Sequence, residues 1–121
     1  MIVRTKIVTG TPDLIEPGAQ LYRDAVVPSC SGVEGFLGGW FLAERSTGRM
    51  MTLTLWAHER GLVDALEALH TAITGDPGLL ERCDTINAGG ARWESWTILE
   101  STGPTDLDGA LAERGNARTL G

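Results

Sequence analysis

The sequence predicts an α+β domain of the ferredoxin-like type, with the element order β-α-β-β-α-β. Three observations carry this prediction: the order of strand-like and helix-like segments, a hairpin signal between the second and third strands, and the chain length. The chain has 121 residues, of which 42% are hydrophobic and 21% charged. Cores divide into separate domains only well above ~200 residues. We therefore expect one domain over residues 1–100 and a polar, glycine-rich tail over residues 101–121.

The first strand and the first helix are indicated by their periodicity. Residues 1–8 alternate cationic and β-branched side chains, as a strand does. Residues 11–27 place apolar side chains at helical spacing. Pro17 interrupts this pattern, so either the helix kinks there or its regular part begins at Pro17. We expect the helix to end at about Val27, before Pro28 and residues 29–32.

The central hairpin is the clearest local signal. Residues 36–45 read as a strand in which Gly38 and Gly39 predict a bulge or the close approach of another group. Residues 46–49 are turn-forming, and residues 50–58 alternate polar and apolar side chains. An antiparallel hairpin follows.

The last third of the domain supplies a helix and the closing strand. Residues 59–74 make one apolar helical face, and Gly75 follows them. We expect a short helical piece at residues 78–84 and a final strand over residues 91–100. With both helices on one face of an antiparallel sheet, this order is the ferredoxin-like topology.

The third strand carries bulk on both of its faces. Leu53 and Leu55 point one way, and Met50 and Trp56 point the other. A sheet that is apolar on both faces needs a second cover, which an identical sheet supplies. We therefore expect a homodimer that buries roughly 1,600 Å² or more between the sheet faces turned away from the helices.

Charge and cysteine usage exclude several partners. Ten Lys and Arg residues stand against sixteen Asp and Glu, giving a net charge of −6. The cations are scattered, so neither nucleic acid nor an anionic membrane is an expected partner. No stretch approaches the ~18–20 apolar residues of a membrane span, and no secretory signal is seen, so we expect a cytoplasmic protein. Cys30 and Cys83 are expected to be reduced thiols.

Four segments together resemble the antibiotic biosynthesis monooxygenase superfamily, and more narrowly an uncharacterised actinobacterial-type branch of it. They are LYRDAVVP at 21–28, VEGFLGGW at 33–40, ERSTG at 44–48 and TLTLWAHE at 52–59. The resemblance covers residues 2–100. It implies a dimeric α+β barrel and a cofactor-independent monooxygenase that acts on an aromatic or polyketide-type small molecule in secondary metabolism.

The chain also departs from characterised members of that superfamily. Quinone-forming members place an Asn four positions before the Trp of the third strand, and a Tyr early in the following helix. Here Trp56 fills the Trp position, but Thr52 and Leu62 stand at the other two. Haem-degrading members need a His late in the second helix, and His70 lies several residues too early for that role. Haem degradation is therefore disfavoured.

The candidate site residues are two histidines and a set of aromatic and polar side chains. His58 and His70 are the candidate general bases; a helix-capping role for His58 and a packing role for His70 are the alternatives. The candidate substrate-binding residues are Trp56, Tyr22, Trp40, Trp93, Arg92 and Thr52. Large rings suit a flat ligand, although they also serve to fill the layers of a sheet.

Two classes of function stay open at this point. One is an enzyme without a bound metal or flavin, in which a dry pocket and a base turn the substrate into an anion that reacts with oxygen or rearranges. The other is a non-catalytic dimeric module that binds a small hydrophobic ligand. An isomerase or cyclase on the same scaffold is a further alternative. The sequence has no phosphate loop, no zinc spacing and no Ser-His-Asp order.

Overall fold

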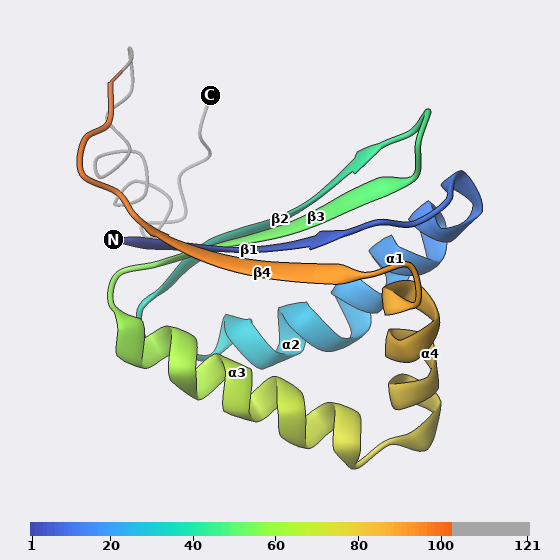
Figure 1. Ribbon diagram of the computed structural model, residues 1–121. Helices are drawn as coiled ribbons and strands as arrows, with labels where there is room; N and C mark the ends of the chain where they lie inside the picture. The colour runs from blue at the N-terminus through green and yellow to red at the C-terminus, as the bar shows by residue number, and fades with distance from the viewer. Residues whose placement is uncertain (103–121) are drawn as a thin grey trace.

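Four antiparallel strands form a single sheet in the order β2-β3-β1-β4. The computed structural model describes residues 1–102, and the sheet and all helices within that range follow the predicted α+β order. The strands are β1 (Ile2–Val8), β2 (Phe36–Glu44), β3 (Arg49–Trp56) and β4 (Ala91–Thr97). The helices of the described residues all lie on one face of this sheet (Figure 1). The predicted ferredoxin-like arrangement is confirmed.

The first crossover is one long helical run with two irregular turns. It consists of η1 (Pro12–Leu14), α1 (Ile15–Leu21), the π-helical turn η2 (Tyr22–Val26) and α2 (Val27–Ser31). The prediction that this run ends before Pro28 was wrong, since α2 continues to Ser31. In the π turn, the Val27 N–H donates to the Tyr22 carbonyl. This wider turn accommodates a proline ring that would clash with a regular preceding turn.

The second crossover contains two helices, α3 (Glu59–Thr74) and α4 (Pro77–Asn87). α4 is longer than the expected piece at 78–84. Its first turn is held by the Asp76 carboxylate, which accepts from the backbone N–H groups of Gly78 at 3.0 Å and Leu79 at 3.1 Å. Pro77 at the first helical position adds to this start signal.

Two strands end earlier than the sequence suggested. β3 stops at Trp56 rather than at residue 58, and β4 stops at Thr97 rather than at residue 100. His58 has left the strand to cap α3. The predicted irregularity in β2 is present, because the pairing register with β3 shifts between Phe36 and Gly38. The expected tail lies almost wholly outside the described residues.

The pairing register assigns each strand residue to a face. Lys6 pairs with Thr52 on one side and Trp93 on the other, and Arg4 pairs likewise with Thr54 and Ser95. We call the face covered by the helices the inner face; its central residues are Arg4, Lys6, Val8, Met50, Thr52, Thr54, Trp56 and Trp93. We call the opposite side the outer face; it carries Val3, Ile7, Trp40, Leu42, Met51, Leu53 and Trp96. Met50 and Trp56 thus lie opposite to Leu53, as predicted.

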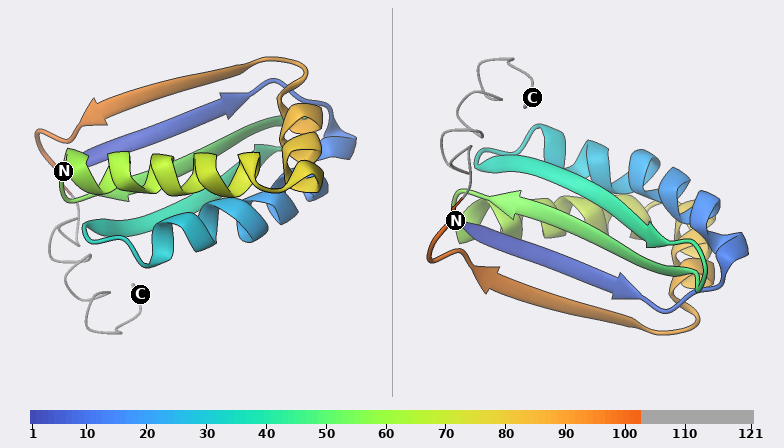
Figure 2. Two further views of the ribbon diagram at one scale, coloured as in Figure 1. Left: turned by 90° about the horizontal axis from the view of Figure 1, so that it is seen from below. Right: turned by 90° about the horizontal axis from the view of Figure 1, so that it is seen from above.

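The helices do not cover the inner face evenly. α3 runs beneath the middle of the sheet beside α1 and α2, whereas most of β4 lies beyond the helices in both views of Figure 2. The buried core forms two separate clusters. One centres on Val8, Leu21, Met50 and Ile86, and the other on Cys30, Trp56, Leu62 and Ala65.

Candidate functional site

A cavity of about 220 Å³ lies between the inner face of the sheet and the helices. Members of both core clusters line it, among them Met50 and Ile86 from one and Trp56 and Leu62 from the other. Its walls are mainly apolar, with a few polar groups. Small-molecule sites typically combine such walls with a small number of placed polar groups. This cavity is the candidate functional site.

Trp56 forms a fixed part of the cavity wall. Its side chain is 0% exposed, and its indole N–H donates to the Thr54 hydroxyl at 2.9 Å. The Phe36 ring packs on it with the ring centroids 5.1 Å apart. Because the indole N–H is already satisfied and the ring is fully buried, Trp56 fixes the shape of the wall and offers a ligand no hydrogen bond.

Tyr22 reaches the cavity from the π turn. A Cβ atom placed on Gly39 would lie only 2.7 Å from the Tyr22 hydroxyl, so the glycine leaves room for that group beneath β2. Burial raises the pKa of Tyr22, and the nearby Cys30 thiol adds to the rise. The phenol is therefore a proton donor at neutral pH, and it has no hydrogen bond to another described residue.

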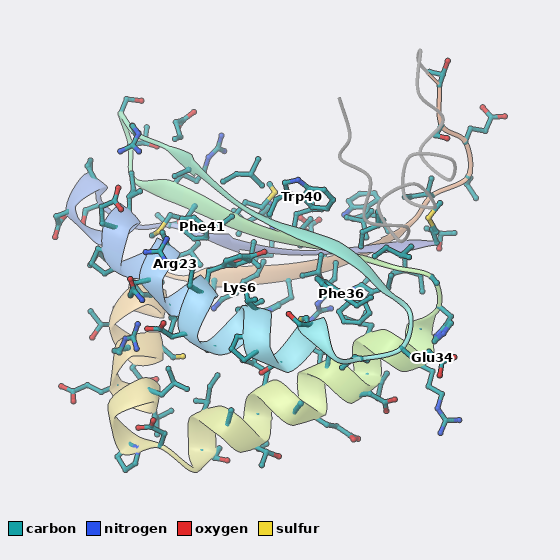
Figure 3. All side chains as sticks on the ribbon, turned by 180° about the vertical axis from the view of Figure 1, so that it is seen from behind. Lys6, Arg23, Glu34, Phe36, Trp40 and Phe41 are labelled. Carbon is teal, nitrogen blue, oxygen red and sulfur yellow. The ribbon has the colours of Figure 1, made fainter. Side chains whose placement is uncertain are left out.

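Two cations from β1 also line the cavity. Lys6 and Arg4 project from the inner face, and Figure 3 shows Lys6 between the sheet and the helices. The Lys6 ammonium lies 5.5 Å from the centre of the Trp93 ring. Burial lowers the pKa of Lys6, and the Cys83 thiol opposes that shift. Arg4 donates from Nη1 to the Ser95 hydroxyl at 3.1 Å, while its buried Nε has no acceptor among the described residues.

Both cysteines line the cavity as neutral thiols. Burial raises the pKa of Cys30 to about 11 and also raises the pKa of Cys83. A thiol is a nucleophile only as the thiolate, so neither group is activated. Asn87 brings a buried side-chain oxygen to the same cavity, and this oxygen has no donor among the described residues.

Four of the candidate residues come together here, and the others do not. Trp56, Tyr22, Trp93 and Thr52 all line the cavity. Trp40 lies on the outer face, as Figure 3 shows. Arg92 also lies on the outer face, where it pairs with Glu94 at 3.4 Å.

Neither histidine lines the cavity. The exposed His58 is the N-cap of α3, and its Nδ1 accepts from the Gly61 N–H at 3.2 Å. Its ring covers Gly35, whose φ of 91° and lack of a side chain leave it the space. His70 is exposed on α3. Within residues 1–102, no group of three or more His, Cys, Asp or Glu side chains is placed to hold a metal ion.

The sequence interpretation did not select Lys6 and Arg4 as site residues. The available signal was strand parity: both share a face with Val8, which is buried under the helices. The described part of the chain contains no helix that is long and apolar enough to cross a membrane.

Sequence comparison finds relatives without an assigned activity. No protein-family model matches the chain. It is 26% identical over 95 residues to the uncharacterized protein Rv2558 of Mycobacterium tuberculosis, a match that covers 78% of this chain and 37% of that protein. The uncharacterized protein Rv2557 is 25% identical over 95 residues, with 78% and 39% covered. The chain thus spans less than half the length of the curated relatives it matches.

Solved structures are similar over nearly the whole described domain. The monooxygenase ActVA-Orf6 of Streptomyces coelicolor, solved with the ligand nanaomycin D, superposes with a TM-score of 0.60 at 15% identity, covering 86% of this chain and 91% of that one. SnoaB, a cofactor-independent oxygenase from Streptomyces nogalater, gives 0.51 at 20% identity, covering 86% and 95%. The chain has the antibiotic biosynthesis monooxygenase fold. Rv0793 of Mycobacterium tuberculosis also superposes, with a TM-score of 0.57 at 10% identity and coverage of 84% and 98%.

Proposed function

We propose that this protein is a cofactor-independent, monooxygenase-like enzyme acting on an aromatic or polyketide-type small molecule, in the cytoplasm and in secondary metabolism. The observation that carries the proposal is the cavity of about 220 Å³ with aromatic walls and a few polar groups. Two similar structures are described as a cofactor-independent oxygenase and as a monooxygenase with a bound ligand. The fold similarity supports the same general chemistry for this chain.

The proposed chemistry needs only a substrate with a C–H group made acidic by conjugation with a carbonyl, either directly or through an aromatic ring. Loss of that proton to solvent or a buffer base gives an enolate, which transfers electrons to O2. In a CH2-to-C=O oxidation, one oxygen atom enters the substrate and the other leaves as water. The mainly apolar lining lowers the polarity around the substrate, Trp56 fixes the wall behind it, and the Tyr22 hydroxyl donates to the enolate oxygen. A preorganised donor in a dry site stabilises such an anion more than water does.

Oxygen uptake with a model substrate tests this proposal. Anthrone and O2 give anthraquinone and water, so we expect one O2 consumed per quinone formed, at a rate above the uncatalysed reaction. Tyr22→Phe should lower kcat by roughly tenfold or more, because a donor to the enolate oxygen is lost. Thr85→Val removes a hydroxyl that lies outside the cavity and should leave the rate unchanged. No oxygen uptake above background with anthrone or related acidic ketones would contradict the oxygenase proposal.

A non-catalytic ligand-binding module is the second candidate. Thr52 and Leu62 favour it, because they line the cavity at the positions where quinone-forming members have Asn and Tyr. An isomerase or cyclase would also suit a cavity that holds an enolate. Under the binding-only reading, nanaomycin D quenches the tryptophan fluorescence, while no acidic ketone is consumed or rearranged.

We also propose that a second copy of the chain covers the outer face. Large apolar side chains stay exposed there: Leu42 is 46% exposed, Trp40 39% and Trp96 59%. A contiguous apolar patch of this kind is unusual on a monomer. A twofold axis between the two sheets, parallel to their outer faces, would bring the same patch from each copy together, which is the self-complementary arrangement of most homodimers.

A further inference from the structure

We propose that Lys6 and Arg4 form an oxyanion-binding subsite inside the cavity, so that the ligand is an aromatic compound carrying a carboxylate or an ionised enol or phenol oxygen. This inference rests on the ligand-binding cavity of the proposed function and names the substrate class. It is carried by the position, the surroundings and the missing counter-charges of the two cations.

The alternation of side chains along β1 directs Lys6 and Arg4 into the same cavity. Lys6 and Arg4 are alternate residues of β1, so their Cβ atoms share the inner face at a spacing of roughly 7 Å. Both side chains line the cavity, and both are partly buried. Two long side chains at this spacing are able to converge on one oxyanion of a bound ligand.

The groups around the two cations are neutral. The strand neighbours of Lys6 are Thr52 and Trp93, and those of Arg4 are Thr54 and Ser95. Among residues 1–102, no Asp or Glu lines the cavity. Arg4 Nε is buried and has no acceptor within residues 1–102, and Lys6 makes a ring contact with Trp93 but no hydrogen bond in that range.

Other arginines of the same chain form ion pairs with carboxylates. Arg82 pairs with Asp24 at 2.9 Å, and Arg49 pairs with Glu44 at 3.6 Å. Both pairs lie at the surface, where such contacts add little stability. Surface arginines, which water would solvate in any case, therefore have acidic partners. Lys6 and Arg4 have no carboxylate partner among the described residues, although their partial burial makes an unpaired charge costly. An anionic ligand would supply that counter-charge.

The remaining titratable groups of the cavity do not compete for this role. Tyr22 of η2, Cys30 of α2 and Cys83 of α4 line the same cavity as Lys6, and the Cys83 thiol influences the Lys6 ammonium directly. Burial raises the pKa of each of these three groups, so they are neutral near pH 7. The pKa of Lys6 is lowered mainly by burial. An oxyanion beside the ammonium would raise that pKa again, so binding at alkaline pH should take up a proton.

The test compares an acid with its neutral isostere. Isothermal titration calorimetry at pH 7 measures binding of naphthalene-2-carboxylate and naphthalene-2-carboxamide to the full chain. We expect the wild type to bind the carboxylate at least tenfold more tightly. Lys6→Met should weaken carboxylate binding by about 10- to 100-fold and leave carboxamide binding within twofold. Lys6→Arg, which keeps the charge, should restore most of the preference.

Controls separate the charge from a general effect on folding. Arg49→Met removes a cation of β3 that lies outside the cavity and should change neither affinity. Arg4→Met provides a second cavity variant if Lys6→Met fails to fold, as judged by circular dichroism. 2-Naphthol, titrated at pH 7 and above its own pKa, distinguishes an ionised phenol from a carboxylate as the preferred oxyanion.

Each result decides the question. Loss of the charge preference in the Lys6 or Arg4 variant, with carboxamide binding retained, supports the subsite. Equal binding of carboxylate and carboxamide to the wild type overturns the subsite and leaves the aromatic cavity of the proposed function intact. Binding of neither naphthalene probe, together with no quenching by nanaomycin D, overturns both proposals.

Discussion

In the middle of β1, the polarity of the two faces is reversed relative to a typical half-buried strand. The face under the helices carries Arg4 and Lys6, while the face turned away from them carries Val3 and Ile7. Antiparallel sheets with one covered face normally place apolar residues inward and charges outward. Here the cations line a cavity, and apolar side chains of the same sheet lie in the open.

This reversal indicates that each face of the sheet lacks a binding partner. The inner face has cations without acidic partners, which an anionic ligand satisfies. The outer face has exposed tryptophan and leucine side chains, which a second copy would cover. Each missing partner yields a separate experiment, because ligand binding and subunit association are measured independently.

The largest expected effect comes from removing the anchor of the inner face. Trp56→Ala should lower the free energy of unfolding by about 3–5 kcal/mol, because the side chain is fully buried and a cavity would remain. Trp93→Ala, at a position 50% exposed on the same face, should cost far less. Urea denaturation followed by circular dichroism measures both. Equal losses for the two variants would mean that Trp56 is not the anchor of the wall.

The next effect concerns the outer face. Leu42→Glu should weaken the proposed dimer by about 10²-fold, roughly 2.7 kcal/mol, because a charge would be buried in an apolar interface. Leu80→Glu is the matched control, since Leu80 is exposed on α4 rather than on the sheet. Multi-angle light scattering at micromolar concentration reports the masses. A monomeric wild type would contradict the proposed dimer.

The fold was predictable because its signals are local. The hairpin of β2 and β3, the apolar face of α3 and the element order all follow from periodicity and turn residues. The end of the first crossover was not predictable in this way. Pro28 normally stops a helix, and only the π turn that precedes it lets the run continue to Ser31.

The site was predictable only in part, for a similar reason. The aromatic residues Trp56 and Tyr22 stand out in any sequence, and both line the cavity. Lys6 looks like a solvated strand residue until the register shows which face the helices cover. His58 looked like a pocket residue because β3 was expected to extend that far. The strand ends at Trp56, and the imidazole caps the next helix instead.

Replacing His58 separates its capping role from a catalytic one. His58→Ala should lower the free energy of unfolding by about 1 kcal/mol, because the Gly61 N–H loses its acceptor. His58→Asn, which keeps a good capping side chain, should recover most of that loss. Turnover of any substrate that is found should change little, since His58 lies outside the cavity lining. A loss of ~10²-fold in kcat for both variants would instead identify His58 as the general base.

The smallest expected effect is the change in stability when the cation Lys6 of the inner face is removed. In the protein without ligand, Lys6→Met should raise the free energy of unfolding by about 0.5–1 kcal/mol and Tm by roughly 2–6 °C, because a partly buried cation without an acidic partner is replaced by an apolar side chain. Exposed Arg49→Met should change stability by no more than about 0.5 kcal/mol.

Burial lowers the pKa of Lys6 from its ordinary 10.5, despite the opposing influence of the Cys83 thiol. Between the lowered pKa and 10.5 the unfolded chain binds more protons than the folded chain, so wild-type stability rises with pH across that window. The advantage of Lys6→Met should therefore be largest below the window and shrink through it, as measured by calorimetry at a series of pH values. A variant less stable than the wild type at pH 7 would mean that the contact of Lys6 with Trp93 outweighs the cost of its burial, and that the cation has a structural role.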